Sequence, residues 1–433
     1  MSMSTDAMYN AESRYLHKKY IIHFSADKTL EVTKSDYLIS SNILEEAFKL
    51  SNSPFGDVTS NELELVLYNT DSIFSPKNED SPYYGFIRRG IKIEAFIRPD
   101  EVDEWDKVGV YYVNEWNTAS SGFTADIVAY DKLYSILNAP VPSLKIARDV
   151  AFAKFVKEYF GLFNTEVYVD EAISLILPYA FTSGYTDNRR LLADLMIAAQ
   201  ADCFCNHSGS VVVKSKTAKR EVRATFTDAD QIITAAIKQS LSTDYDSASI
   251  TYNAMQESQE MNILSISDLN ITPGITAVGL TKFSTDRVLS VKSIKATSSV
   301  SVKPLTFEAT ADSIAYSLQS TSEALTQVDF IGTILEKVSS IVSTDGAAAI
   351  ELDSQFVQTK SLAESLCEYV DSYVDAAMPT LELVVRGNPK IELGDLVQVY
   401  SARYKLKYTG TVAKAEYGYD GGLSCKMTLV VLM

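Results

Sequence analysis

The chain has 433 residues, of which 46% are hydrophobic and 22% are charged. A disordered acidic tail would carry far less apolar content, so the composition indicates a globular protein, with roughly two to four domains. The 39 basic and 56 acidic residues give a net charge of −17. Proteins that bind nucleic acid neutralise its phosphates with Lys and Arg, so this charge and the lack of a basic block argue against specific nucleic-acid binding.

Tyrosine is the most frequent aromatic residue, with 25 Tyr against 18 Phe and 2 Trp. Tyrosine is favoured in half-buried strands and at interfaces, which indicates a β-rich protein that assembles with others. The four cysteines, Cys203, Cys205, Cys367 and Cys425, are too few for a disulfide scaffold and are predicted to be reduced. No signal peptide or long apolar run is present, so we expect synthesis in a cytoplasm and no stable membrane insertion.

Alternating apolar and polar residues dominate residues 20–138. Two short strands flank Ser25 to Lys28, and a later strand places Leu63, Leu65 and Leu67 on one face. This region is predicted to be one mostly antiparallel β domain of six or seven strands, preceded by an amino-terminal arm over residues 1–19.

A proline-containing break at residues 138–143 starts a predicted small α/β domain over residues 139–222. Apolar residues at helical spacing predict one helix after Ser143 and a second one before a hairpin that turns at Asn206 to Gly209. The inward residues expected in the second helix are Leu191, Leu192, Leu195, Met196 and Ala199.

Residues 223–344 are predicted to be a β-rich accessory region with helices, and part of it is assigned to the carboxyl-terminal domain. One helix is expected from Thr227 to about Ser240, and a second is expected from Ser320 to Val342 because Val328, Ile331, Leu335 and Val338 are spaced helically. Between them, residues 245–310 are Ser/Thr-rich and predict strands with long connections.

The carboxyl-terminal region, residues 345–433, is predicted to be a helix followed by strands. The helix runs from Thr359 to Met378 and is ended by Pro379. The last hairpin is expected to turn at Asp420-Gly421. Together the elements predict an α+β, mainly antiparallel β fold.

Candidate chemistry is sparse. The histidines are His17, His23 and His207, and the nearest approach to a metal site is Cys203, Cys205 and His207 at alternate positions. A buried thiol pair beside a turn histidine is the plainer interpretation, because no fourth ligand is nearby.

The densest acidic set is Asp100, Glu101, Asp103, Glu104 and Asp106, which could supply a glycosidase pair or weak cation ligands but is more typical of a solvated loop. The pairs Arg88-Arg89 and Arg189-Arg190 are interpreted as isolated surface charge. Phosphate-binding and hydrolase motifs are absent. The sequence therefore predicts no catalytic, cofactor-binding or metal-binding residue.

The order of several stretches resembles one family. ELELVLYNTD, YGFIRRGIKIEAFI, VGVYYVNEW and TADIVAYDKLYSIL, followed by a proline-punctuated helix, resemble the first domain of tail-tip and baseplate hub proteins of tailed bacteriophages. LPYAFTSGYTDNRRLLADLMIAAQADCFCNHSGSVVVKS resembles that family's small α/β domain. RGNPKIELGDLVQVY and AEYGYDGGLSCKMTLVVL resemble its second barrel. Residues 216–344 resemble the family only loosely.

The resemblance implies two tail-tube-like β-barrel domains, with the small α/β domain between them and a helix-containing insertion. It implies a trimeric structural hub in the virion that adapts a hexameric tail tube to a threefold tip and closes the tube. Implied partners are a distal tail or tail tube protein, the tape-measure protein, and a spike, fibre or other baseplate protein, while DNA transits the lumen. Since many relatives continue into a lytic or fibre domain and this chain stops at Met433, lytic activity is expected in another polypeptide.

Two alternatives remain at this point. A peripheral receptor-binding or adhesin component is favoured by the Ser/Thr-rich residues 245–310, and a cell-wall hydrolase would draw its acids from Asp100 to Asp106. If the excess acid lines the inner wall of a ring, it would also keep transiting DNA from adhering.

Overall fold

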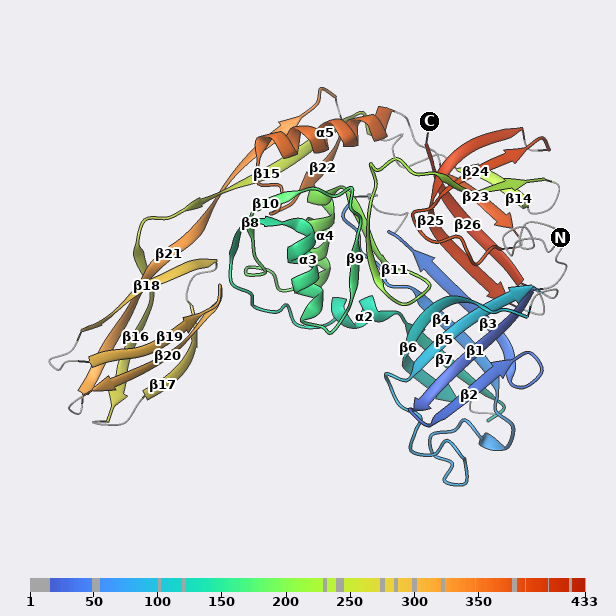
Figure 1. Cartoon of the computed structure of the whole chain (residues 1–433), viewed down its shortest axis with the longest axis horizontal. Helices are drawn as coiled ribbons and strands as arrows, with labels where there is room; N and C mark the ends of the chain where they lie inside the picture. The colour runs from blue at the N-terminus through green and yellow to red at the C-terminus, as the bar shows by residue number, and fades with distance from the viewer. Residues whose placement is uncertain are drawn as a thin grey trace.

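The computed structural model describes most of the chain and shows an elongated molecule in which the first and last described residues lie at the same end (Figure 1). The described residues are 16–48, 55–99, 103–118, 122–228, 232–238, 245–272, 277–283, 287–297, 302–320, 324–346, 348–375, 380–385, 387–403, 405–419 and 423–432. The predicted amino-terminal arm lies almost entirely outside them.

A mainly antiparallel sheet, with 13 strands in the described part, forms this end of the molecule. Its first half follows the order β3-β4-β7-β6-β5-β1-β2. Alternation explains these strands, since Leu63, Leu65 and Leu67 of β4 all point into the core. The bounds are β1 Leu16–Ser25, β2 Lys28–Thr33, β3 Leu38–Glu46, β4 Glu62–Tyr68, β5 Lys92–Pro99, β6 Asp106–Thr118 and β7 Thr124–Tyr130, with a short 3-10 turn at Thr70–Ser72.

The second half of the sheet collects strands from distant parts of the sequence. Its order is β14-β23-β26-β25, and β24 pairs with both β25 and β13. The bounds are β13 Val222–Thr227, β14 Ile232–Lys238, β23 Thr380–Val385, β24 Leu396–Ser401, β25 Leu406–Tyr419 and β26 Leu423–Leu432. The β25 to β26 pairing is antiparallel as expected, although the turn predicted at Asp420-Gly421 lies outside the described residues.

A small α/β unit occupies the middle of the molecule (Figure 1). Asp131 and Asp187 cap α2 and α4, because each carboxylate accepts a hydrogen bond from a backbone N–H two residues further on. In α4, Leu191, Leu192, Leu195 and Met196 are buried as predicted. The bounds are α2 Lys132–Leu137, β8 Ala147–Ala151, α3 Phe152–Gly161, β9 Val167–Val169, β10 Ile176–Ala180, α4 Asn188–Ala199, β11 Ala201–Cys205 and β12 Val211–Ser215.

An arm of strands extends away from the large sheet, and α5 lies along the arm's base (Figure 1). The long strand β21 runs through the arm and pairs with β15, β16 and β18, while β17, β20 and β19 form a separate sheet. The bounds are β15 Ser247–Glu257, β16 Met261–Ile271, β17 Ala277–Lys282, β18 Val288–Thr297, β19 Val302–Ala309, β20 Ser313–Ser320, β21 Ala324–Ser343, β22 Ala349–Asp353 and α5 Lys360–Asp375. Among the described helices, none has the length and apolar character that spanning a membrane requires.

Two predicted helices are wrong, and the helix expected after Ser143 begins only at Phe152, because residues 147–151 form β8. The segment expected to be helical over residues 320–342 is the strand β21, and the one expected over residues 227–240 contains the end of β13 and then β14. β-branched residues are frequent in both segments and favour strands. In β21, Val328 and Phe330 alternate into the arm's core, so a period of two prevails over the helical spacing.

Candidate functional site at the sheet junction

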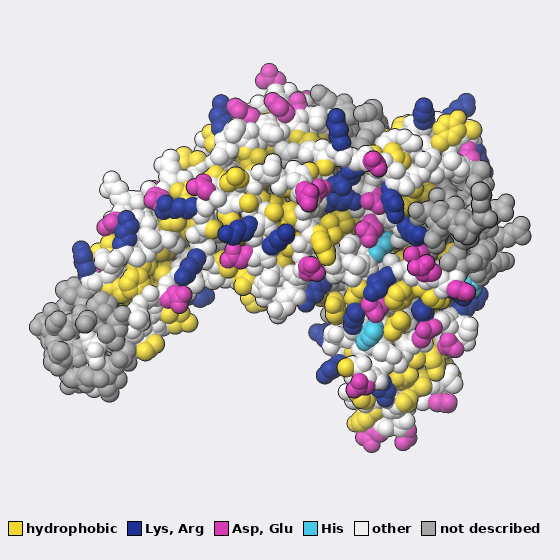
Figure 2. All heavy atoms as spheres, viewed as in Figure 1, with side chains coloured by type: hydrophobic (Ala, Val, Ile, Leu, Met, Phe, Trp, Pro, Cys, Tyr) yellow, Lys and Arg dark blue, Asp and Glu magenta, His cyan; other side chains and the backbone are white. Residues whose placement is uncertain are grey.

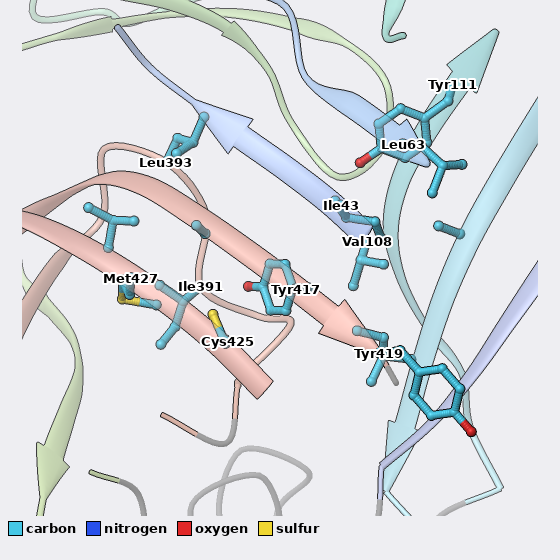
Figure 3. Close-up of a cluster of buried hydrophobic side chains, with 14 of the residues drawn as sticks. Ile43, Leu63, Val108, Tyr111, Ile391, Leu393, Tyr417, Tyr419, Cys425 and Met427 are labelled. Atoms are coloured by element: carbon cyan, nitrogen blue, oxygen red, sulfur yellow. The ribbon is translucent and has the colours of Figure 1, made fainter. Parts of the chain in front are cut away.

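The two halves of the large sheet meet where β3 pairs with β25. The antiparallel register runs from Ser41 opposite Tyr419 to Glu46 opposite Lys414. The Lys414 ammonium also lies 2.6 Å from the Glu46 carboxylate. In Figure 3, Tyr417 and Cys425 of the second half and Ile43 of the first half face a shared core. The junction is therefore a continuous hydrogen-bonded sheet with apolar packing across it.

A buried lysine from β1 reinforces this junction. The Lys18 ammonium donates hydrogen bonds to the Tyr417 carbonyl at 2.9 Å and to the Ser41 hydroxyl at 3.4 Å. The Tyr20 hydroxyl donates to the same Ser41 oxygen at 2.7 Å. Burial lowers the pKa of Lys18 to about 7, and the nearby Cys425 thiol only partly offsets that effect. Lys18 thus links three strands while its charge is only weakly favoured.

His207 connects the small α/β unit to both halves of the sheet. Its Nε2 lies 3.1 Å from the Glu45 carboxylate of β3, and its backbone N–H donates to Glu392 at 3.1 Å. Burial alone would lower the pKa of His207, but Glu45 and then Glu392 outweigh burial and raise it to about 9. The protonated imidazole therefore forms a buried ion pair at the point where three parts of the fold meet.

The three residues considered as possible soft metal ligands, Cys203, Cys205 and His207, do not converge. Cys203 and Cys205 are buried on β11 in the core of the α/β unit, whereas His207 faces Glu45 and Glu392. No group of three His, Cys, Asp or Glu side chains is placed to hold a metal ion in the part of the chain that the structure describes. Burial, with Asp131 as the next cause, raises the pKa of both thiols.

We expect the four cysteines to be unreactive in the folded protein. All four are free and buried, and burial raises the pKa of each thiol, so the nucleophilic thiolate is scarce. Titration with a thiol-reactive chromophore should show little reaction under native conditions and full reaction in denaturant. Rapid native reaction of one cysteine would contradict the burial described here.

The acidic loop does not form a carboxylate pair in the described residues. Asp103 and Glu104 are exposed, and Asp103 pairs with Arg98 at 3.1 Å. Asp106 begins β6, while Asp100 and Glu101 lie outside the described residues. The remaining histidines are dispersed, with His23 bonded to Glu94 at 2.8 Å and His17 on β1.

The two arginine pairs differ. Arg88 and Arg89 are exposed, as predicted. Arg190 is also exposed, as predicted, but neither residue of this pair is isolated, because Arg189 donates to the Val58 carbonyl at 2.6 Å and Arg190 pairs with the fully buried Asp194 at 3.0 Å. Both residues are partners within the fold, which spacing along the sequence does not reveal.

The structure contains a basic cleft that the sequence analysis does not predict. Five basic residues fall within residues 214–223, so the statement that the chain has no basic block is wrong. Four of them, Lys214, Lys216, Lys219 and Arg220, line a cavity of about 480 Å³. The net charge of −17 concealed this local reversal of sign.

Two solved structures share this architecture over nearly their whole length. The 43 kDa tail protein of prophage MuSo2 from Shewanella oneidensis covers 95% of this chain and 98% of its own, with a TM-score of 0.55 and 12% identity. The chain has the fold of a phage tail protein. The tail protein from Neisseria meningitidis MC58 agrees, covering 96% of each chain with a TM-score of 0.55 and 8% identity. No protein-family model and no curated protein sequence matches the chain.

The tail-protein fold confirms the resemblance that the order of stretches predicts, and it confirms the mainly antiparallel β class. Within this fold, Lys18, Glu45 and His207 are held by buried polar contacts between units rather than aimed into an open cavity. Their arrangement fixes the relative placement of the sheet halves and the α/β unit.

Proposed function

We propose that the chain is a structural protein of a bacteriophage tail and forms a threefold hub at the tip or baseplate. The observation that carries the proposal is the joining of two sheet halves through β3 and β25 in one chain. If each half is a tube-like barrel, three chains supply six such units, which matches a hexameric tail tube. The fold shared with a prophage tail protein and with a second tail protein supports this assignment.

The two edge strands of the large sheet could pair between subunits and so form a ring. The described sheet path runs from β14 at one end to β2 at the other. Edge strands present main-chain groups that can pair with another chain, and two different edges favour head-to-tail contacts, which close into a ring when the rotation allows it. We assign the subunit contact to β14 of one copy and β2 of the next.

Exposed aromatic residues at the strand ends and connections of the first sheet half support contact with another protein ring of the tail. Tyr68, Tyr84, Phe86 and Phe123 are all exposed, and Phe123 is 74% exposed. The backbone N–H of Asn69 donates to the Phe123 carbonyl at 2.8 Å, which places the β4 end beside the β6 to β7 loop. Exposed aromatic groups are typical of protein interfaces. We assign this end to contact with a distal tail, tail tube or other baseplate protein.

The proposed hub is made in the host cytoplasm and incorporated into the virion, where it closes the tube, anchors the tape-measure and spike or fibre proteins, and allows DNA to pass on infection. The role is structural and not enzymatic. On the face drawn in Figure 2, acidic and basic side chains are interspersed. An acidic inner wall remains a prediction that a map of the assembled ring would test.

A peripheral receptor-binding role is the second candidate. The arm favours it, because Val278 and Leu280 on β17 are 79% and 77% exposed, although both are apolar. A peripheral location of the chain in the particle, rather than an axial one, would favour this alternative over the hub.

Native mass spectrometry of the purified full chain is expected to show a trimer, and a reconstruction of the particle is expected to show threefold symmetry at this chain. The same sample in mild denaturant serves as the monomer control. A strictly monomeric chain that is absent from the tail axis would contradict the hub proposal.

A further inference from the structure

We propose that the basic cleft binds an acidic segment of another tail protein that also carries an aliphatic or aromatic side chain. The basic cleft is the cavity of about 480 Å³ lined by Lys214, Lys216, Lys219 and Arg220, with Asp202 as its acidic lining residue. The cleft lies within one chain, so the inference does not depend on the ring proposal, but its choice of partner rests on the proposed role as a tail protein.

The cleft forms where three parts of the fold meet. The β12 to β13 connection supplies its basic wall, α5 supplies Tyr369 and Tyr373, and the second sheet half supplies an apolar wall. Phe55 packs edge-on against both tyrosines, with ring centroids 5.8 Å and 5.3 Å apart. The other apolar lining residues are Phe48, Ala218, Leu396, Val412, Ala413 and Val430.

The cations along this wall are held in place by neighbouring groups. The Lys214 ammonium lies 2.8 Å from Asp395, that of Lys216 lies 2.7 Å from Asp202, and Arg220 lies 3.0 Å from Asp170. Lys216 also lies over the Phe48 ring, 4.4 Å from its centroid. Carboxylate pairing fixes these cations before a ligand arrives, which lowers the entropy lost on binding.

Lys219 adds a basic group that is exposed at the cleft. With it, four basic residues line the cleft, and because carboxylates pair with three of them, Lys219 leaves an excess of one positive charge in a chain whose net charge is −17. This local excess of positive charge attracts acidic groups, whereas the net charge of the whole protein repels them. The charge therefore selects an acidic ligand.

The apolar wall selects the kind of acidic ligand. Phe48 and Phe55 are buried, and Tyr369 and Tyr373 are half-buried. Flat exposed rings that would stack with successive bases of a nucleic acid are therefore not what this wall presents. A side chain of Leu or Phe size would fill the apolar part, while flanking carboxylates would face the lysines. A short acidic peptide segment fits both features.

Fluorescence anisotropy with the full-length protein tests this inference. The probe is a labelled synthetic peptide that alternates Glu with Leu and Phe. Its controls are the same peptide with Gln for Glu and the same peptide with Gly for Leu and Phe. We expect the probe to bind and both control peptides to bind more weakly.

Two variants localise the binding. Lys219→Glu is expected to weaken it by about threefold to tenfold, since a surface charge pair is lost and reversed. Ala218→Trp is expected to block the cleft sterically and abolish binding, because Ala218 lines it. Matched controls are Lys157→Glu on α3 and Ala26→Trp in the β1 to β2 turn, both exposed. Circular dichroism of each variant checks that it folds.

The inference is overturned if the probe does not bind, or if Ala218→Trp folds and leaves binding unchanged. It is also overturned if an oligo-dT strand competes more strongly than the peptide, which would assign the cleft to nucleic acid. Self-association that is lost in Ala218→Trp would instead assign the cleft to a second copy of this chain.

Discussion

Replacing His207 with alanine is expected to lower the free energy of unfolding by about 3 kcal/mol, because it leaves the Glu45 carboxylate buried without its cationic partner. The side chains of His207 and Glu45 are only 8% and 3% exposed. His23→Ala is the matched control, since its pair with Glu94 is 30% and 13% exposed. We expect His23→Ala to lower the free energy of unfolding by less than about 1 kcal/mol. Denaturant unfolding at pH 7 measures both.

The same histidine is expected to make stability depend on pH. Its pKa is raised from 6.5 to about 9 in the folded protein, so the folded state holds this proton more tightly than the unfolded state. The contribution is therefore fully present below the unfolded pKa of 6.5 and is lost as pH rises through about 9. Unfolding curves across this range should show a decline that His207→Ala lacks. An equal decline in both proteins would show that other groups cause it.

Local periodicity was sufficient to predict much of the fold. The leucines of β4 alternate, and α4 has both a capping carboxylate and helical apolar spacing, so each element is specified by its own sequence. The strand β21 was mispredicted because its apolar residues fit two periods, and its pairing with β15, β16 and β18 decides between them. Tertiary pairing of this kind leaves little trace in a short window of sequence.

The junction could not be predicted from spacing. Lys18 bonds to the carbonyl of Tyr417, and His207 pairs with Glu45, across large distances in sequence. A single sequence does not record such partners, so both residues resembled ordinary surface groups or a turn histidine. The basic run from Lys214 to Arg223 was visible, and a local count of charge would have found it. Only the structure shows that this basic run lines the same cavity as Tyr369 and Tyr373.

Ile233→Glu is expected to dissociate the proposed ring while leaving the subunit folded. Ile233 lies on β14, at one end of the large sheet, and is 48% exposed although it is apolar. The new carboxylate would be buried at the subunit contact without a cationic partner. Such a substitution typically weakens the free energy of association by at least about 2 kcal/mol, which is roughly a 30-fold increase in the dissociation constant. Sedimentation velocity across a concentration series measures the shift.

Ile176→Glu supplies the control, because Ile176 is 60% exposed on β10 of the small α/β unit, away from either end of the large sheet. It introduces the same charge and removes the same apolar side chain. A trimer that survives Ile176→Glu but not Ile233→Glu would assign the contact to β14. If Ile233→Glu remains trimeric, the ring closes through another surface, and if both variants dissociate, added charge rather than the sheet edge is responsible. The comparison thus tests which strand forms the subunit contact. Whether the chain forms a trimer at all is tested independently by native mass spectrometry.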